Sequence, residues 1–546
     1  MSYKQKIIKI SFYCIFIYLF LTTGIVNSQS DLFGEKLLKM NQFKTVKGYL
    51  LNKLKVNPND INALYLLGET YYKLGNKDSA HFYFSKGIVL NPNDYNCNIG
   101  IAKIMIDNSN NAEAKKIIEK VKLLSKYKDV NVMVSIADAY ISSKNKQFEF
   151  ASEILEKAKE IDITKPMIHI ISGDLNSLID KVGEAANDYE RAIYYDKNCV
   201  EAFYKLGKIY HTARNNNESI KAYTNALNID STYIPVWRDL AELYYSIGSY
   251  QKASEAFFKY IQLTEPDLND HFRYATILFF NKEYSKSLIE TENALRKDPE
   301  NFIMKRLYAY NLLETKDYQK SLIAINDFMS KASENKIISS DYEYYGKILS
   351  KNNKDSIAII IFEKAMNMDS TKKVLYENIG ASYDKLKKFE KAVEAYYNAI
   401  TFKINPSALD YFALGKSAYF YGGSIADTDS LIKIQYLQKA DTSFTKVIEL
   451  SPKSHLGYFW KARVNALLDP NTITGIAKPW YEQVINILEA NPTKSPKDLV
   501  EAYGYMGVYL IKTDDIKGSK VYWNKIIEID PKNEDALKYK DLKEKK

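Results

Sequence analysis

Small side chains recur along this chain at a nearly constant interval. Glycine or alanine stands at fourteen positions, and neighbours in this set lie 34 to 37 residues apart until two last intervals of 47 and 45 residues. The set is Gly34, Gly68, Ala102, Ala137, Gly173, Gly207, Ala241, Ala275, Ala309, Gly346, Gly380, Gly415, Ala462 and Gly507. A chain of 546 residues is long enough for several globular domains. A fixed period over its length predicts stacked copies of one structural unit instead.

A second set of small residues follows the first, in most repeats twelve positions later. Thirteen of its fourteen members are alanine or serine. The set is Val46, Ala80, Ala114, Ala151, Ala185, Ser219, Ala253, Ser287, Ser321, Ala358, Ala392, Ala440, Ala477 and Ser519. Paired small residues predict two helices that cross closely, because a bulky side chain at the crossing would overpack it.

The stretch from Asn62 to Asp94 contains one complete unit. It reads as two amphipathic helices with a Gly-Asn turn between them and a proline stop at the end. The unit resembles the tetratricopeptide repeat, whose pattern is matched by Leu64, Leu67, Gly68, Tyr71, Ala80, Phe84, Gly87 and Pro92. The resemblance covers nearly all of residues 29–546 and is weakest over 95–128, which lack the usual aromatic residues. It implies an all-α fold, a right-handed superhelical solenoid of about fourteen helix-turn-helix units.

The first residues have the layout of a secretory leader. Lys4, Lys6 and Lys9 precede an apolar run that ends near Val26, and Asn27-Ser28 then supply compact residues before Gln29. This pattern predicts a signal peptide over residues 1–28, and hence an exported, periplasmic chain. The alternative is an N-terminal anchor that stays in the inner membrane with the repeats facing the periplasm.

The rest of the chain divides by the regularity of its repeats. Residues 29–60 form a first, irregular unit, 61–407 a continuous array, 408–531 further repeats with insertions, and 532–546 a capping helix and tail. The insertions lie near Gly422–Lys433 and Leu468–Gly475. Insertions in repeat folds are loops that are either tolerated on the surface or gathered on a functional face.

No residue pattern of an enzyme or a metal site is present. The five histidines fall in different repeats, and no Walker loop, G-x-S-x-G or H-E-x-x-H motif occurs. We therefore expect a non-catalytic protein without cofactor or metal. The net charge of +9 includes no dense run of basic residues, which argues against nucleic-acid binding. Cys97 and Cys199 lie about three repeats apart and are expected to be free thiols, because only adjacent repeats touch in such an array.

The family resemblance implies that the first helix of each repeat, helix A, lines the inside of the superhelix. The inward positions are about the second, fifth, ninth and twelfth of each repeat. The candidate partner-binding residues there are Tyr65, Tyr72, Tyr204, Lys208, Arg238, Tyr245, Phe272, Arg306, Tyr310, Phe412, Lys416 and Arg463. Aromatic and cationic side chains of this kind suit an acidic or aromatic peptide. The alternative is that some of the tyrosines pack against the neighbouring helix A.

The resemblance does not extend to the chaperone-binding members of the family. Those members hold a terminal carboxylate with a lysine at the fifth position and an asparagine at the ninth. The corresponding pairs here include Tyr65/Glu69, Tyr204/Lys208, Arg238/Glu242 and Arg306/Tyr310, so chaperone binding is not implied. The expected function is a scaffold that binds other proteins or peptides during assembly or maintenance of the cell envelope. A membrane-tethered scaffold is the alternative, and an accessory enzyme of the envelope is a weaker one.

Overall fold

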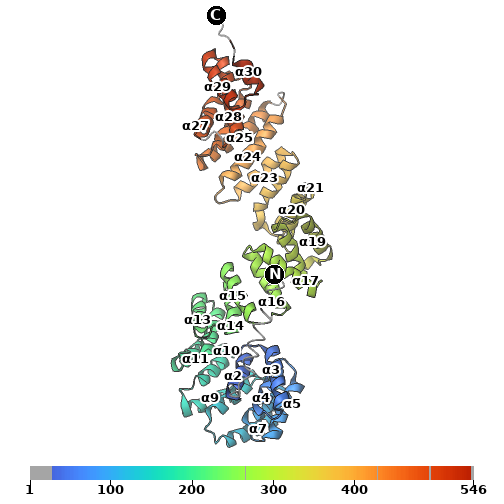
Figure 1. Ribbon diagram of the computed structural model, residues 1–546, viewed down its shortest axis with the longest axis vertical. Coiled ribbons are helices and arrows are strands. Elements are labelled where there is room, and N and C mark those ends of the chain that lie inside the picture. The colour runs from blue at the N-terminus through green and yellow to red at the C-terminus, as the bar shows by residue number, and fades with distance from the viewer. Residues whose placement is uncertain are drawn as a thin grey trace. The chain divides into compact units, whose positions relative to one another are not determined.

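The computed structural model describes residues 27–264, 266–426, 428, 430–490, 494–540 and 542, with side chains from Leu32 onward. These residues form twenty-nine α-helices and two short 3-10 helices, with no strand among them. The expected all-α repeat array is therefore confirmed. By their internal contacts the helices fall into two compact units, unit 1 over residues 1–290 and unit 2 over 291–546 (Figure 1).

Consecutive helices pair as helix A and helix B of each repeat. Unit 1 contains α2 (Asn27–Lys39), α3 (Phe43–Val56), α4 (Ile61–Lys73), α5 (Lys77–Leu90), α6 (Tyr95–Asp107), α7 (Asn111–Leu124), α8 (Val130–Ser142), α9 (Phe148–Asp162), α10 (Pro166–Leu178), α11 (Val182–Tyr195), α12 (Val200–Thr212), α13 (Asn216–Ile229), α14 (Ile234–Ser246), α15 (Tyr250–Leu263), α16 (Leu268–Phe280) and the start of α17 (Tyr284–Lys297). Helix α2 begins at Asn27, inside the predicted leader, whose earlier residues lie outside the described part of the chain.

Unit 2 continues the same alternation. Its helices are α18 (Phe302–Glu314), α19 (Tyr318–Lys331), η1 (Glu334–Lys336), α20 (Ser339–Lys351), α21 (Asp355–Met368), η2 (Ser370–Leu375), α22 (Tyr376–Lys385), α23 (Phe389–Thr401), α24 (Ala408–Ser424), α25 (Ser430–Leu450), α26 (His455–Leu468), α27 (Lys478–Glu489), α28 (Pro496–Lys512), α29 (Ile516–Ile529) and α30 (Glu534–Tyr539). Most of these helices are 13 or 14 residues long, as the repeat period requires.

The two sets of small residues lie where helix A crosses helix B. A Cβ atom added at Gly68 would stand 2.4 Å from the buried ring of Phe84, and one added at Gly207 would stand 2.5 Å from Tyr223. Three of the four serines of the second set add a hydrogen bond to this crossing, whereas Ser321 donates to Tyr318 of its own helix. The hydroxyl of Ser219 donates to the Gly207 carbonyl at 2.7 Å, and Ser519 donates likewise to Gly507 at 2.9 Å. Small residues are thus required for close approach, and serine also satisfies its hydroxyl there.

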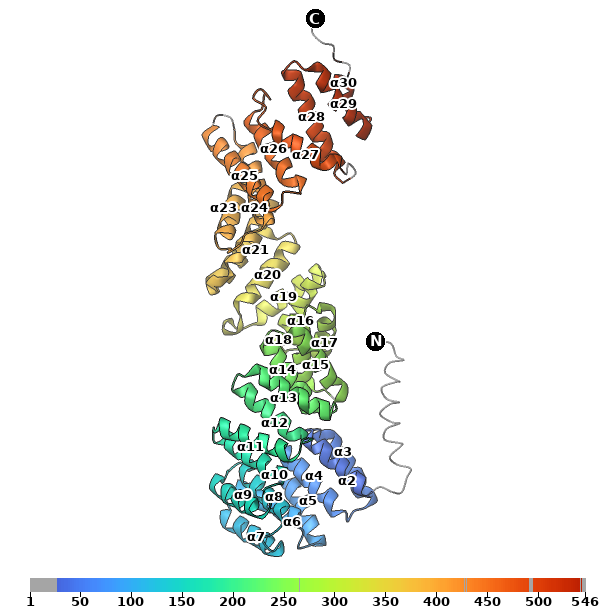
Figure 2. The same cartoon turned by 90° about the vertical axis from the view of Figure 1, so that its left-hand side faces the viewer.

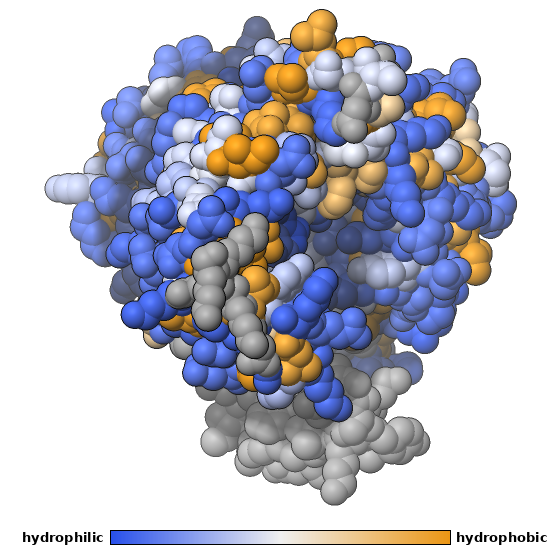
Figure 3. Space-filling model, turned by 90° about the horizontal axis from the view of Figure 1, so that it is seen from above, coloured by the Kyte–Doolittle hydropathy of each residue, from blue (hydrophilic) through white to orange (hydrophobic). Residues whose placement is uncertain are grey.

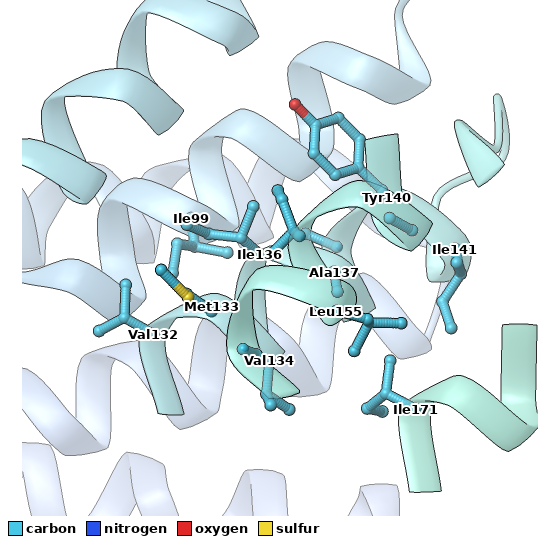
Figure 4. Packing of buried hydrophobic residues seen from close by; sticks show 14 of the residues in the cluster. Ile99, Val132, Met133, Val134, Ile136, Ala137, Tyr140, Ile141, Leu155 and Ile171 are labelled. Atoms are coloured by element: carbon cyan, nitrogen blue, oxygen red, sulfur yellow. The ribbon is translucent and has the colours of Figure 1, made fainter. Parts of the chain in front are cut away.

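Helices α6, α8 and α10 are buried on almost every side. Ten of the thirteen residues of α6 and nine of the thirteen of α8 are buried, whereas α12 buries only four. Figure 4 shows Ile136 and Met133 of α8 packed between Ile99 of α6 and Leu155 of α9. A helix that is apolar all round must be covered on all faces. The inner side of this part of unit 1 is therefore filled by its own side chains.

The first repeat also touches the sixth and seventh repeats of unit 1. Lys36 pairs with Asp230 at 3.0 Å, Lys39 with Glu201 at 3.5 Å, and Met40 is buried in a cluster around Tyr233. Figures 1 and 2 both place α2 and α3 next to these later helices of unit 1. The expectation that only adjacent repeats touch is therefore wrong here. The curvature of the array brings its start back against residues some 200 positions on.

The described residues of the two insertions differ in structure. The first lengthens a helical pair, because α24 runs to Ser424 and α25 begins at Ser430. In the second, the carboxylate of Asp469 accepts backbone hydrogen bonds from Ile473, Thr474 and Gly475 at 2.8–3.0 Å. The second insertion is thus held by its own hydrogen bonds rather than left as a free loop.

Within the described residues, no helix combines the length and the hydropathy needed to cross a membrane. On the face seen in Figure 3, hydrophilic side chains predominate and hydrophobic ones are scattered among them.

Candidate interaction surface on the inner faces

Arg306 and Tyr310, two of the predicted binding residues, are held by a buried carboxylate. The Arg306 guanidinium donates to both oxygens of Asp341, at 2.7 and 2.9 Å, and the Tyr310 hydroxyl donates to the same group at 2.6 Å. The Asp341 side chain is wholly inaccessible to solvent. Burial and the neighbouring carboxylate raise the pKa of Tyr310 well above its usual range. These residues therefore join α18 to α20.

The same kind of bridge recurs between other neighbouring A helices. Tyr204 of α12 donates to Asp239 of α14 at 2.9 Å, and Tyr72 of α4 donates to Asp107 of α6 at 3.1 Å. Arg463 of α26 donates through Nε to Glu501 of α28 at 2.7 Å. At each bridge a carboxylate of the next A helix accepts a hydrogen bond from a predicted binding residue.

Tyr65 and Tyr72 lie at the beginning of the filled part of unit 1. The Tyr65 ring packs 6.1 Å from that of Phe84, and burial raises its pKa well above the usual value. Lys103, only 2% exposed, pairs with Glu69 at 3.2 Å and lies 4.4 Å from the centre of the Tyr72 ring. This supports the alternative that some tyrosines pack against the neighbouring helices.

Later in unit 1 the inner side is open. Lys208 is exposed, lies 5.6 Å from the ring centre of Tyr204, and has no carboxylate at ion-pair distance among the described residues. The Arg238 side chain is 55% exposed and lies 3.9 Å from Asp270. Burial raises the pKa of Asp239, while Tyr204 and the nearby cations Lys208 and Arg238 oppose that shift. This part of unit 1 presents cations with little competition from carboxylates.

Tyr245 and Phe272 complete the predicted set in unit 1. Arg273 covers the Tyr245 ring at 4.0 Å and also pairs with Glu242. Phe272 is half-buried on α16. The structure therefore places Tyr245 beside Arg273 and its partner Glu242, and Phe272 on the following A helix.

In unit 2, Phe412 and Lys416 lie against a tryptophan that the sequence analysis missed. The Trp460 ring of α26 lies 6.0 Å from Phe412 and 5.9 Å from Phe420, both on α24. The Nζ atom of Lys416 stands 5.8 Å from the centre of Trp460 and 5.9 Å from that of Phe420. Trp460 occupies the sixth position of its repeat, outside the positions searched, although its spacing from Leu456 places both on one side of α26.

A shallow hollow adjoins these residues between α22, α23 and α24. Its volume is about 320 Å³, and Ala381, Leu409 and Ala413 are among its lining residues. Glu377 and Asp410 also line it and both pair with Lys403. We call the surface formed by Leu409, Phe412, Lys416, Phe420, Leu456 and Trp460 the open face.

The described residues contain no group of histidine, cysteine and acidic side chains that could hold a metal ion. Cys97 is buried and Cys199 half-buried, both as free thiols, and burial raises the pKa of each. A raised thiol pKa disfavours the nucleophilic thiolate. Neither thiol is therefore activated as a nucleophile.

Known proteins share this repeat. The sequence pattern of the tetratricopeptide repeat matches residues 61–94, 200–233 and 374–403. A TPR repeat-containing protein of Methanocaldococcus jannaschii is 24% identical over 294 residues, which are 49% of this chain and 46% of that protein. The Hsp70-Hsp90 organizing protein of Triticum aestivum is 23% identical over 163 residues, which are 30% of this chain and 27% of that protein. The chain thus spans less than half the length of these curated relatives.

Solved structures show the same likeness. The C-terminal part of a TPR repeat-containing protein from Cytophaga hutchinsonii is 30% identical and covers 50% of this chain and 100% of its own, with a TM-score of 0.43. A tetratricopeptide repeat protein from Parabacteroides merdae is 16% identical and covers 46% of this chain and 98% of its own, with a TM-score of 0.30. The three matched stretches, together with the small residues at the helix crossings, identify the chain as a member of the tetratricopeptide repeat family.

Proposed function

We propose that this protein is an exported, non-catalytic scaffold that binds segments of other proteins on the inner faces of its A helices. One observation carries the proposal: cations there stay exposed and unpaired beside aromatic rings, as Lys208 does at Tyr204 and Lys416 at Trp460. Most other inner charges are matched within the array, as Arg306 is by Asp341. Exposed aromatic and cationic side chains are the ones that protein interfaces favour.

The cellular setting follows from the leader. A basic start and an apolar run before Ser28 support export, and assembly or maintenance of the envelope is the role proposed for the scaffold. The membrane-tethered form differs only in whether the leader stays attached. Intact-mass measurement of the protein from its native envelope separates the two, since a cleaved chain begins near Gln29 and a tethered one begins with the leader.

Photo-crosslinking in intact cells tests the scaffold function. A photoreactive amino acid is placed at Lys208 or Lys416 on the inner faces, and at Ile323 or Leu123 on exposed parts of the B helices. We expect a discrete crosslinked protein from the inner positions and none from the outer ones. Equal crosslinking from both sets, or none from any position, would refute binding on the inner faces.

A further inference from the structure

The fifth repeat carries polar side chains at three packing positions that most other repeats fill with apolar ones. Ser172 on α10 lies one position before the first small residue of its repeat, where every other repeat has a large apolar or aromatic residue except for Lys461. Asn176 lies three positions after that small residue, where every other repeat is apolar or aromatic except for Asn465. Asp188 on α11 lies three positions after the second small residue, where most repeats have alanine, isoleucine or an aromatic residue. Buried packing positions rarely hold such residues without a specific reason.

The three polar residues line one hollow between α9, α10 and α11. Its volume is about 330 Å³, and none of the three occupies an inner position of its repeat. Ser172 is only 4% exposed, and its hydroxyl has no hydrogen-bond partner among the described residues. Asp188 is 5% exposed and accepts a hydrogen bond from the Asn176 amide at 2.8 Å. A buried hydroxyl without a partner is unfavourable, so a ligand group that bonds to it gains free energy.

The thirteenth repeat shows the same two helix A positions in a purely structural role. Lys461 and Asn465 both donate to the carboxylate of Asp441, at 2.6 and 2.8 Å. Lys461 also donates to the Thr445 hydroxyl at 2.7 Å. There, polar side chains bond to one another across the repeat, whereas in the fifth repeat shorter ones surround a hollow.

The charges that line the hollow balance. They form three pairs, Lys159 with Glu156 at 2.8 Å, Lys181 with Glu184 at 3.2 Å and Arg191 with Asp188 at 3.4 Å. A cationic ligand would meet three bases and an anionic ligand three acids, so neither is favoured. Among the lining residues only Leu155 and Leu175 are apolar, and a hydrocarbon ligand would leave the polar groups unpaired. The lining therefore suits a neutral ligand that both donates and accepts hydrogen bonds.

We propose that this hollow binds a sugar. A carboxylate has about four acceptor sites, and Asn176 and Arg191 use two of those on Asp188. Two adjacent hydroxyl groups of a sugar ring can donate to the remaining sites, whereas the N–H groups on one side of an extended peptide lie about 7 Å apart. Ser172 and Asn187 offer further hydrogen bonds to the ring. The site lies outside the inner faces, and the assignment does not depend on the scaffold function.

Saturation-transfer NMR and calorimetry on the full chain test the ligand class. The probes are glucose, galactose, mannose, N-acetylglucosamine and oligosaccharides of each, and the comparison ligands are inorganic phosphate, putrescine and a peptide of serine and asparagine. We expect at least one sugar to bind with a dissociation constant of about 1 mM or lower, and the comparison ligands to bind at least about tenfold more weakly. Tighter binding of an oligosaccharide than of its monosaccharide identifies a polysaccharide chain as the source, and equal binding a free sugar. No binding of any sugar, or tighter binding of the peptide, overturns the proposal.

A triple variant locates the site and separates binding from folding. Ser172→Leu, Asn176→Tyr and Asp188→Ala copy the residues of the following repeat, which are Leu206, Tyr210 and Ala222. We expect sugar binding to be lost and the melting temperature to stay unchanged or rise, because polar partners are replaced together by apolar groups. In the contrasting variant, Lys461→Leu with Asn465→Tyr, Asp441 loses its partners, so we expect a lower melting temperature and unchanged sugar binding. Sugar binding by the triple variant, or equal losses of melting temperature in both variants, overturns the assignment.

A single exposed side chain tests the site without changing the packing. Asn187 lines the hollow and is exposed, and Lys221 is the matched control because it occupies the same position of α13 and its side chain is 70% exposed. We expect Asn187→Ala to weaken sugar binding at least about threefold and Lys221→Ala to leave it within about 1.5-fold, with unchanged melting curves for both. Equal affinity of Asn187→Ala and the wild type overturns the proposed site.

Discussion

The inner faces of α6, α8 and α10 in unit 1 differ from those of α22, α24 and α26 in unit 2. In the first group the fifth position of helix A carries Ile99, Val134 and Ile170, all buried in packed surroundings. In the second, Glu377 and Phe412 at the same position are only half-buried, although Phe459 is buried. At the ninth position Lys416 is exposed, whereas Lys103 of α6 is buried. The inner side chains of the same repeat can thus be buried in the protein's own core or remain exposed to solvent.

The side chains at the second position show how the sequence makes this choice. In unit 1 this position holds Asn62, Asn96, Asn131 and Asn269 in four of the eight repeats, whereas in four of the six repeats of unit 2 it holds Ile303, Val374, Leu409 and Leu456. The four aliphatic residues of unit 2 are all exposed. Exposure of apolar area without a partner costs free energy, which is recovered when a partner covers it. Unit 2 therefore exposes more aliphatic area at this position than the filled part of unit 1 does.

The largest expected effect separates a mostly buried cation of the inner faces, Arg306, from a mostly exposed one, Arg238. Arg306→Ala removes the partner of the fully buried Asp341 carboxylate, so we expect it to lower the free energy of unfolding of unit 2 by about 3–5 kcal/mol. Arg238→Ala removes a mostly exposed side chain and should change stability by about 0.5 kcal/mol or less. Urea denaturation of both variants measures the difference. Similar midpoints would show that Asp341 is not held as the structure indicates.

From the sequence, Arg238 and Arg306 were both predicted to bind a partner. The residues that distinguish such positions are carboxylates in the next repeat. Tyr72 and Asp107, Tyr204 and Asp239, and Arg306 and Asp341 are each separated by 35 residues, so that their side chains meet between neighbouring A helices. A search for a carboxylate one period after each aromatic or cation would have found these bridges. The helix pairs and their crossings could be predicted, because glycine, alanine and serine at fixed spacing indicate helices that cross closely.

Other features could be predicted only in part. Val130–Ser142 is apolar on nearly every side, which is a signal for a helix buried all round, and the neighbouring repeat at 95–128 lacks the usual aromatics. The contact of Lys36 with Asp230 carries no such signal, because it depends on the accumulated curvature of the intervening repeats. The position of Trp460 beside Lys416 depends on how α26 packs on α24, which the repeat period alone does not specify.

A core substitution tests the contrast between the filled and the open inner face directly. Ile136→Ala in α8 leaves a cavity among fully buried neighbours, and we expect a loss of about 2–5 kcal/mol in unit 1. Leu409→Ala on the open face removes a side chain that touches mostly solvent and should cost about 0.5 kcal/mol or less. Thermal or urea melts provide the measurement. Comparable losses at both sites would mean that Leu409 is covered in solution.

The filled region should also respond to acid through His169 on α10. This ring is buried, and its Nε2 atom lies 2.7 Å from the Ile163 carbonyl, while its Nδ1 atom has no hydrogen-bond partner among the described residues. Burial lowers the pKa of His169, although the Ile163 carbonyl opposes the shift. A histidine whose pKa is lower in the folded state stabilises the fold above its unfolded pKa of about 6.5 and loses that contribution as pH falls through that value toward the folded one.

We therefore expect the denaturation midpoint of unit 1 to fall between pH 7.5 and pH 5.5 by more in the wild type than in His169→Gln, whose amide can still bond to the carbonyl. His81→Gln is the control, because His81 is exposed on α5. An identical pH response in the wild type and His169→Gln would show that His169 is not the group that titrates.

The smallest expected change concerns the contact that brings the first repeat against the sixth and seventh. Lys36→Glu with Lys39→Glu replaces attraction to Asp230 and Glu201 by repulsion, but both lysines are half exposed. Exposed ion pairs contribute about 1 kcal/mol or less each, so the melting temperature should change little while Met40 keeps its apolar contacts.

The effect should instead be local, because stability in such arrays is a sum of neighbouring terms. We expect faster amide exchange in α2, α3 and the turn around Tyr233, at low ionic strength above all, and unchanged exchange in α6 and α8. If α6 and α8 also exchange faster, the packing of the filled inner face depends on the contact between the first repeat and the later repeats of unit 1. The contrast with the open face of unit 2 would then arise from that contact rather than from the residues of α6, α8 and α10 themselves.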